Sequence, residues 1–345
     1  MTKEWRFFTR WNKRIQITVV LLFAAMIALF FLNLATGSAA LSFREVTDAL
    51  LGRGGSEKTR TILWELRMPR TGAAILLGGA LAVSGVLLQT FFRNPIAGPF
   101  ILGISSGARL TVACALILCL GRGILIGSAG LVAAAFAGAM ASLLVVLLIA
   151  RRAEGMAVLM VCGVMIGYVC SALTELLVAF AGEENIVHLH NWSMGSFSGI
   201  DGGDLAVIAA VLAVTAPGIL LLAKPMAAFQ MGEDFARSVG VNLWWFRVGL
   251  ILLSGLLAAV VAAYAGPVSF VGIAVPHLIR IACGTEKPVV IVPVSFLGGG
   301  VFCLFCDFVA RNVFAPTELS ISTITAVFGA PIVISMLLAE RGRRG

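Results

Sequence analysis

Apolar residues run through almost the whole chain in long stretches, which short polar segments interrupt. A bilayer core about 30 Å thick requires about 20 helical residues for each crossing. Ten stretches fit this length and predict ten transmembrane helices, at residues 15–34, 72–92, 100–120, 124–149, 156–181, 204–223, 243–264, 268–282, 289–314 and 321–339. We therefore expect an all-α integral membrane protein that forms a single transmembrane domain over residues 1–345.

The eighth stretch, 268–282, is the weakest of the ten, because it is short, contains Pro276 and carries His277 and Arg280. We expect a short or re-entrant helix buried in protein, where a broken backbone is tolerated at membrane depth. Residues 67–181 and 247–339 each hold four crossings, and the two sets enter the membrane from opposite sides. This count predicts inverted repeats, which are typical of transporters.

Composition supports the membrane assignment. With 60% hydrophobic and 12% charged residues, the chain has too little polar surface to cover a soluble globule of this size. If the N-terminus is cytoplasmic, 16 of the 25 lysines and arginines fall on the inside, in agreement with the positive-inside rule. We therefore expect both termini in the cytoplasm, and basic loops beside anionic lipid account for most of the net charge of +8.

The chain shows no pattern of catalytic or metal-binding residues. The seven cysteines lie in or beside apolar runs, so we expect buried thiols, including Cys303 and Cys306 in a CxxC. His188 and His190 are two residues apart, a spacing that suits a strand or loop, and a third metal ligand is missing. No Ser-His-Asp set, carboxylate pair or HExxH motif occurs, which indicates that the chain is not an enzyme and holds no cofactor or metal.

The run GRGGSEKT, from Gly52 to Thr59, resembles a phosphate-binding loop, but Glu57 replaces the second glycine of that motif. If ATP drives this protein, ATP and magnesium must therefore bind to another chain. The alternative is an ion-coupled secondary transporter, which would need acidic groups in mid-membrane. Only Glu175 and Asp307 come near that requirement, and both lie near the ends of their segments.

Residues 224–247 form a polar interruption, with the sequence KPMAAFQMGEDFARSVGVNLWWFR. Glu233 and Asp234 predict the start of a short helix, and Gly240 stands where a left-handed cap would end it. A helix of two turns is not stable alone in water. We therefore expect it to dock on the cytoplasmic face of the protein itself or on a soluble partner.

Three arginines are expected on the outer side. Arg67 and Arg70 stand one helical turn apart in RMPR, where Pro69 suits the first turn of the second crossing, and Arg311 ends the ninth crossing. One interpretation is that these side chains snorkel to the interface. The other is that they form a cationic dock for acidic residues of an external partner, since guanidinium groups bind carboxylates through paired hydrogen bonds.

Polar residues on the inner side and within the crossings are few. RNPIAGP, at residues 93–99, predicts a structured turn, because Asn94 before Pro95 cannot continue a helix. The segment is either a structural turn alone or a cytoplasmic gate. Arg109 lies within the third crossing, so it needs a partner or a water-filled cavity and is a candidate for the transport path. Asp307 stands four residues before Arg311 and can pair with it.

Five motifs, in the same order, closely resemble the FecCD permeases. They are RMPRTGAAILLGGALAVSGVLLQTFFRNPIAGPFILGISSGA, WSMGS, GEDFARSVGV, AGPVSFVGIAVPHLIR and FAPTELSISTITAVFGAPIVISMLL. The resemblance extends from about Arg67 to Leu338. It implies a BtuC-like type II ABC importer permease with ten transmembrane helices and inverted repeats, located in the bacterial cytoplasmic membrane. The implied cargo is a ferric siderophore, haem or cobalamin.

The resemblance also implies partners and contact residues. Such permeases work as homodimers or as pairs of homologous permeases, bind two ATP-binding cassette ATPase subunits, and receive cargo from an extracytoplasmic substrate-binding protein. Docking of the binding protein corresponds to Arg67, Arg70 and Arg311. Contact with the ATPase corresponds to coupling helices at about 224–242, with Gly232, Glu233, Ala236, Arg237 and Gly240. The cytoplasmic gate corresponds to Asn94, Pro95, Ile96, Met156 and Ala157.

Three positions depart from the family pattern. Arg109 replaces a small residue after SSGA, and Ser320 and Ser322 stand where proline and glycine are usual after Glu-Leu. Since Arg109 and the last crossing are expected near the transport path, these changes are the ones we expect to influence cargo.

Overall fold

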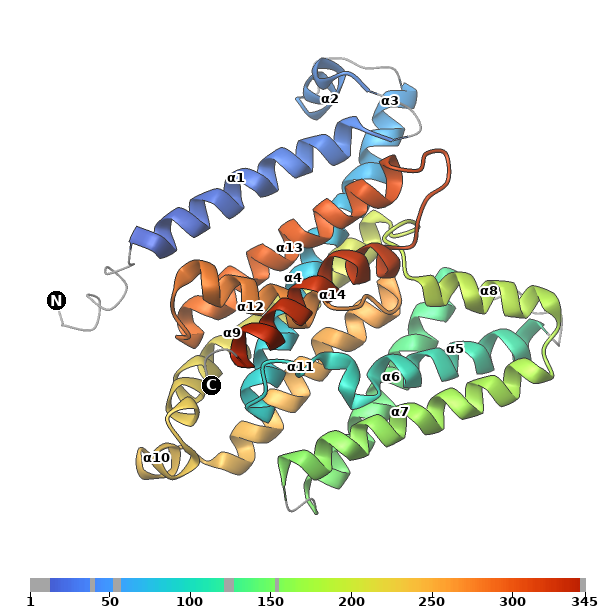
Figure 1. Ribbon diagram of the computed structural model, residues 1–345. Helices are drawn as coiled ribbons and strands as arrows, with labels where there is room; N and C mark the ends of the chain where they lie inside the picture. The colour runs from blue at the N-terminus through green and yellow to red at the C-terminus, as the bar shows by residue number, and fades with distance from the viewer. Residues whose placement is uncertain (1–12, 38–40, 52–56, 121–126, 153–154, 342–345) are drawn as a thin grey trace.

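The computed structural model describes residues 13–37, 41–51, 57–120, 127–152 and 155–341 (Figure 1). Every regular element in these ranges is a helix. Eight helices are long and apolar enough to cross a membrane, and the two shorter apolar helices at 104–117 and 271–283 complete the predicted ten. The weak eighth stretch is indeed a short helix, and most of its residues are buried.

The ten apolar helices are α1 (Lys13–Ala35), α4 (Met68–Phe92), α5 (Ile104–Leu120), α6 (Ser128–Ala150), α7 (Met156–Ala179), α9 (Gly202–Gln230), α11 (Leu243–Ala265), α12 (Val271–Cys283), α13 (Pro288–Asn312) and α14 (Ile321–Arg341). Short elements connect them: α2 (Phe43–Leu50), α3 (Glu57–Thr61), the π-helix η2 (Ile62–Arg67), the 3₁₀ turn η3 (Pro99–Leu102), α8 (Glu183–Met194) and α10 (Glu233–Ser238).

Two predicted boundaries differ from the structure. The second crossing does not start beside Pro69, because helix runs without a break from Glu57 through η2 into α4. The N–H of Met68 bonds to the carbonyl of Leu63, five residues back, and this wider π turn precedes a proline that cannot donate its own hydrogen bond. The sixth crossing extends to Gln230, so the first residues of the predicted coupling segment belong to α9 and only α10 stands apart.

The packing of α4–α7 is repeated by α11–α14. Helix α4 packs against α13, and α11 packs in the same way against α6. Within each set the second helix contacts the third and the fourth, as α5 contacts α6 and α7, and α12 contacts α13 and α14. This correspondence agrees with the two sets of four crossings predicted from the sequence.

Glycine allows the central helices to approach closely. A Cβ atom on Gly85 of α4 would lie 1.8 Å from the carbonyl oxygen of Gly272 in α12, and one on Gly78 would lie 2.5 Å from that of Gly299 in α13. Only residues without a side chain permit these contacts. Helix α4 is accordingly the central helix. In its most apolar stretch of 18 residues 83% is buried, against 6% in the corresponding stretch of α1.

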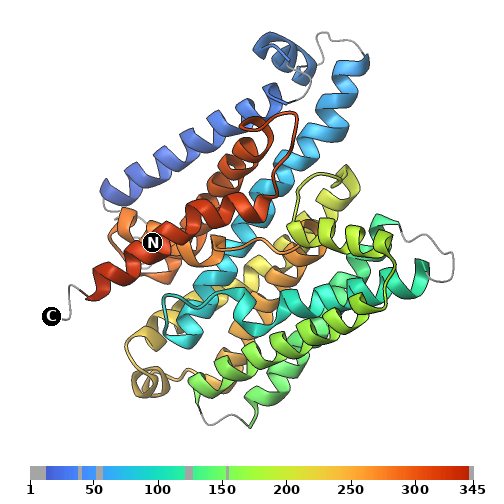
Figure 2. The same cartoon turned by 45° about the vertical axis from the view of Figure 1, so that its right-hand side comes forward.

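The bundle has two distinct ends (Figures 1 and 2). The beginning of α1, the end of α14 and the helix α10 lie at one end, and α2, α3 and α8 lie at the other. We call these the α10 end and the α2 end.

Helix α2 begins with a capping box in which Ser42 and Glu45 exchange hydrogen bonds, and these bonds, first from the Ser42 backbone and then from its hydroxyl, lower the pKa of the Glu45 carboxyl.

Candidate functional site

Two arginines meet around one buried aspartate at the α2 end, and a third, Arg67, bonds to the end of α1, which Arg311 also contacts. Arg70 of α4 donates from Nε and Nη2 to Asp307 of α13, with an Nη2–Oδ1 distance of 2.9 Å. Arg311 lies one turn further along α13, and its Nε is 3.2 Å from the other carboxylate oxygen. The predicted pairing of Asp307 with Arg311 is therefore confirmed. We call Arg67, Arg70, Arg311 and Asp307 the arginine cluster.

The cluster also holds the end of α1. Arg67 donates to the carbonyls of Leu34 and Ala35, at 2.6 and 3.1 Å, and so satisfies carbonyls in the last turn of that helix. Arg311 donates to both the backbone and the side-chain oxygen of Asn33. The arginines thus join α1, α4 and α13, which are far apart in sequence.

Little of the cluster reaches the surface. Arg67 is 6% exposed and Arg311 8%, while the side chain of Arg70 is 13% exposed. The outer edge of Arg70 is covered by Glu318, whose carboxylate is 3.2 Å from Nη1 and whose side chain is 51% exposed. The snorkelling interpretation is wrong for Arg67 and Arg311, because both are buried in protein. Docking of an external protein stays a prediction, and Arg70 is the member best placed for it.

The turn at residues 93–98 lies at the α10 end, after the last residue of α4. Arg93 has a left-handed conformation, with φ of 49°, and ends the helix. The Asn94 side chain accepts a hydrogen bond from the N–H of Ile96, which is the local bond that turns of this kind use. The predicted structured turn is therefore present, with Ile96 36% exposed at its tip.

The other predicted gate residues begin α7. Met156 is its first residue and packs partly against the core, whereas Ala157 is exposed. Neither position contains a hydroxyl group, so these two residues offer apolar surface only. Their role in a gate stays a prediction.

Helix α10 is held between two glycines with left-handed backbone, Gly232 at φ 131° and Gly240 at φ 87°. The predicted short helix and its glycine cap are therefore confirmed. Ala236 is fully buried, so it attaches α10 to the body of the protein rather than meeting a partner. Glu233 is 2.8 Å from Arg247 of α11, a pair that sequence spacing did not indicate, since Arg237 was the basic residue at helical distance.

The free face of α10 carries the residues a partner would meet. Phe235 is 41% exposed and Val239 55%, and Asp234 and Arg237 are exposed beside them. Exposed apolar side chains rimmed by charge are typical of a protein-contact surface. The exposed Trp244 and Trp245 follow at the start of α11, where indole rings suit the membrane interface.

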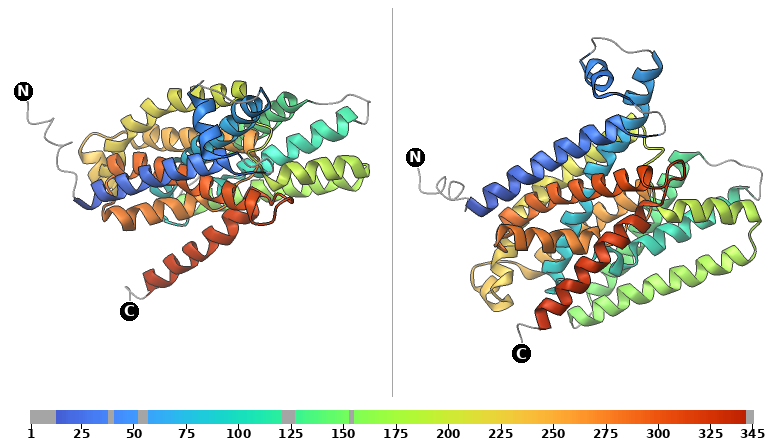
Figure 3. Two further views of the ribbon diagram at one scale, coloured as in Figure 1. Left: turned by 90° about the horizontal axis from the view of Figure 1, so that it is seen from above. Right: turned by 45° about the horizontal axis from the view of Figure 1, so that its top comes forward.

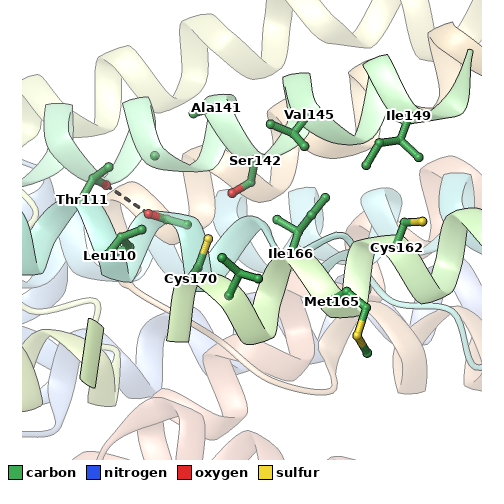
Figure 4. Close-up of a pocket in the computed structure, with 13 residues that line it drawn as sticks. Leu110, Thr111, Ala141, Ser142, Val145, Ile149, Cys162, Met165, Ile166 and Cys170 are labelled. Atoms are coloured by element: carbon green, nitrogen blue, oxygen red, sulfur yellow. Dashed lines mark hydrogen bonds between the residues drawn. The ribbon is translucent and has the colours of Figure 1, made fainter. Parts of the chain in front are cut away.

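Arg109 is exposed on α5, and among the described residues it has no hydrogen-bond or ion-pair partner. Beside it, a groove of about 470 Å³ opens between α5, α6 and α7. Figure 4 shows Ser142 of α6 facing Cys170 and Ile166 of α7 across this groove. Gly107, Leu110 and Thr111 line it from α5, and Arg109 does not.

The histidines lie on α8, so the predicted strand or loop is wrong there: residues 183–194 form a helix that follows Gly182. Glu183 and Glu184 in the first turn suit a helix N-terminus. His188 is 3.8 Å from Glu184, an exposed pair one turn apart. In the described part of the chain no three potential ligands gather around a metal position.

The remaining sequence features have local roles. Cys303 and Cys306 are buried in α13, as expected of apolar thiols. Ser320 caps the first turn of α14 by accepting from the N–H of Thr323, and Ser322 donates to the carbonyl of Pro267. Of the phosphate-loop-like run, Gly52 to Ser56 lie outside the described residues, and Glu57 to Thr59 lie in α3.

Comparison with known proteins identifies the family. The model described as the FecCD transport family matches residues 25–339. The vitamin B12 import system permease protein BtuC of Klebsiella pneumoniae subsp. pneumoniae is 37% identical over 288 residues, 84% of this chain and 86% of that protein. The protein of the same name from Citrobacter koseri is 36% identical over 286 residues, 83% of this chain and 85% of that one.

A solved structure, an inward-facing conformation of a metal-chelate-type ABC transporter, is also similar. It has a TM-score of 0.82 and 27% sequence identity, over 94% of this chain and 99% of that chain. The match therefore covers nearly the whole of both chains. This chain belongs to the FecCD transport family.

Proposed function

We propose that this chain is the permease subunit of an ATP-driven importer that moves a metal chelate across the bacterial cytoplasmic membrane. The match to the FecCD family over residues 25–339, together with relatives named as vitamin B12 import permeases, supports this function. A ferric siderophore, haem and cobalamin are the cargoes to test. The α10 end faces the cytoplasm in this proposal, and both termini lie there.

The ATPase partner meets the free face of α10. Phe235 and Val239 enter an apolar groove of the ATPase, and Asp234 and Arg237 form ion pairs at its rim. Ala236 and the Glu233–Arg247 pair hold α10 in place from behind. Two ATPase subunits then require two copies of this surface, one from each permease of a dimer.

The dimer contact involves helices that one chain leaves largely uncovered. In their most apolar stretches, 11% of α7 and 28% of α14 is buried within the chain, and α1 and α9 are similarly uncovered, at 6% and 17%. Figure 3 shows α14 projecting from the body of the bundle when it is viewed from above. We place the transport path between the two permeases beside these helices.

Movement of α10 reaches the 93–98 turn through one side chain. Arg93 donates to the carbonyl of Phe229, at 3.2 Å, and its guanidinium lies 4.3 Å from the centre of that ring. Phe229 is buried near the end of α9, directly before α10, and packs on Phe246 of α11. A shift of α10 on ATP binding would therefore move the turn that carries Asn94 and Ile96, and so open or close the path.

An uptake assay in proteoliposomes tests the function. The permease is reconstituted with its ATPase and binding protein, and entry of each candidate chelate is followed with ATP, with an inactive ATPase and with an ion gradient alone. Uptake that needs ATP hydrolysis is the expected result. Uptake driven by a gradient without ATP would reject the proposal in favour of a secondary transporter.

The ATPase contact has its own test. Replacing Phe235 and Val239 by serine should abolish co-purification of the ATPase while the permease still inserts into the membrane. Phe180→Ser is the matched control, since Phe180 is 83% exposed but follows α7 at the opposite end. Full retention of the ATPase by the α10 variant would reject α10 as the contact.

A further inference from the structure

Arg109 lies close to half-way along the membrane-spanning part of the bundle. The helices α5 and α7 lie side by side, and a Cβ on Gly103 would contact the carbonyl of Gly163 at 3.1 Å. Gly163 is seven residues into α7, about 10 Å at 1.5 Å per residue, and Arg109 is about 9 Å further along α5. A helix of 24 residues is about 36 Å long, so Arg109 is level with the middle of α7.

A charge at this depth is costly in hydrocarbon, so such residues face a protein interior or a water-filled cavity. Arg109 differs from the buried arginines, because it is exposed and forms no hydrogen bond or ion pair within the described part of the chain. Glu175, the one acidic residue of α7, is also exposed and does not pair with it. The described part of the chain therefore provides no counter-charge for Arg109.

Polar groups continue the surface around Arg109. Ser105 lies one turn before it on α5 and Ser106 is three residues before it, and both are partly exposed. Neither hydroxyl has a hydrogen bond to another described residue. A guanidinium with two free hydroxyls beside it offers hydrogen-bond donors to an anion, whereas hydrocarbon would leave all of them unsatisfied.

We propose that Arg109 is a cargo-contacting residue, which attracts an anionic group of the transported chelate in a water-filled path at mid-membrane depth. The proposal rests on the importer function above and adds a charge preference to it. Arg109 attracts the anion by its charge and holds it by hydrogen bonds, and Ser105 and Ser106 complete the contact. Because a single cation binds loosely, the cargo can leave toward the cytoplasm.

Charged thiol reagents of opposite sign test this in membrane vesicles. The probes are sulfonatoethyl and trimethylammonioethyl methanethiosulfonate, applied to the full chain with its seven native cysteines replaced and Ser105→Cys introduced. We expect the anionic reagent to react about tenfold faster than the cationic one after normalisation to a free thiol, because Arg109 attracts one and repels the other. Arg109→Gln should bring the ratio close to one, and Arg109→Lys should preserve it.

Ala141→Cys is the matched control, since Ala141 is exposed near the middle of α6 and lines the apolar groove. It should react with neither reagent. An unreactive Ser105→Cys, or a ratio that Arg109→Gln leaves unchanged, would overturn the proposal. Labelling needs neither cargo nor ATPase, so this failure would leave the importer function standing, which the uptake assay tests by itself.

A second measurement requires no substitution. Phenylglyoxal modifies accessible guanidinium groups, and mass spectrometry locates the modified residues in the unaltered chain. Arg109 should be modified while the buried Arg67 and Arg311 remain intact. Protection of Arg109 to the same degree as those two would count against a water-filled path at this position.

Discussion

The arginine cluster and Arg109 both place positive charge among apolar helices, but only the charges of the cluster are paired within the described part of the chain. In the cluster, Asp307 lies between Arg70 and Arg311, and Arg67 and Arg311 also donate to oxygens at the end of α1. Arg109 is exposed and has no such partner among the described residues. The cluster therefore holds helices together, whereas Arg109 has no partner among the described residues and is the residue for which we propose a contact with cargo. Stability measurements can separate these two roles.

Asp307→Asn should have the largest effect on stability. The substitution removes the counter-charge that the buried Arg311 shares with the partly buried Arg70, and breaking a buried ion pair from one side costs about 3–5 kcal/mol. Thermal unfolding of the purified protein in detergent measures the loss. The control is Asp48→Asn, whose exposed pair with Arg44 at 3.8 Å should contribute less than about 1 kcal/mol. Equal unfolding temperatures for the two variants would contradict a structural role for the cluster.

Arg67→Met should have the next largest effect. Methionine fills similar space, but the carbonyls of Leu34 and Ala35 lose their charged donor, at a cost of about 2 kcal/mol. The same unfolding experiment measures it, with the highly exposed Arg44→Met as control. A reversal of charge at Arg67 is a poor test of docking for the same reason, because it would disturb the end of α1 as well. An unfolding temperature like that of the parent protein would mean that water satisfies these carbonyls.

Glu318→Gln should change stability by less than about 1 kcal/mol, because its carboxylate is half exposed and salt screens such pairs. The same change uncovers the outer edge of Arg70. If an external protein docks there through its own carboxylates, its affinity for the purified permease complex should rise, most clearly at low salt. Surface plasmon resonance with the immobilised complex provides the measurement. A fall in affinity would show that Glu318 itself contributes to the docking surface.

Arg109→Gln should have the smallest effect on stability, within about 0.5 kcal/mol, because no hydrogen bond or ion pair to a described residue is lost. Transport of an anionic chelate should nevertheless weaken, with a higher KM and with partial rescue by Arg109→Lys. Parallel unfolding and uptake measurements on the same preparations provide the comparison with Asp307→Asn. A destabilisation as large as that of Arg67→Met would place Arg109 among the structural arginines.

Several local features followed directly from the sequence. Gly240 ends α10 as predicted, because glycine adopts a positive φ angle without strain and this requirement is visible in the residue type. Asn94 before Pro95 likewise predicted the turn at 93–98. The spacing of the two histidines does not predict the helix at 183–194, and the acidic first turn at Glu183 and Glu184 is the better signal.

The partners of the charged residues could not be predicted in the same way. Asp307 was paired correctly with Arg311 because they are one helical turn apart. Arg70 is 237 positions from Asp307 and Asn33 is 278 from Arg311, so no periodicity connects them. Glu233 had a basic residue at helical spacing in Arg237 and yet pairs with Arg247 of the next helix.

By itself the sequence determined that the chain crosses the membrane about ten times, because each crossing requires a long apolar helix that satisfies its own backbone. It also determined the family, through motifs spread over nearly the whole chain. Only the tertiary structure decided which helices are central. The most apolar stretches of α1 and α4 have mean hydropathies of 2.7 and 2.0, so both are strongly apolar, yet α4 is mostly buried and α1 is not. Lipid and protein interior are equally apolar, so hydrophobicity cannot distinguish them, and close glycine contacts and buried charge pairs make that choice.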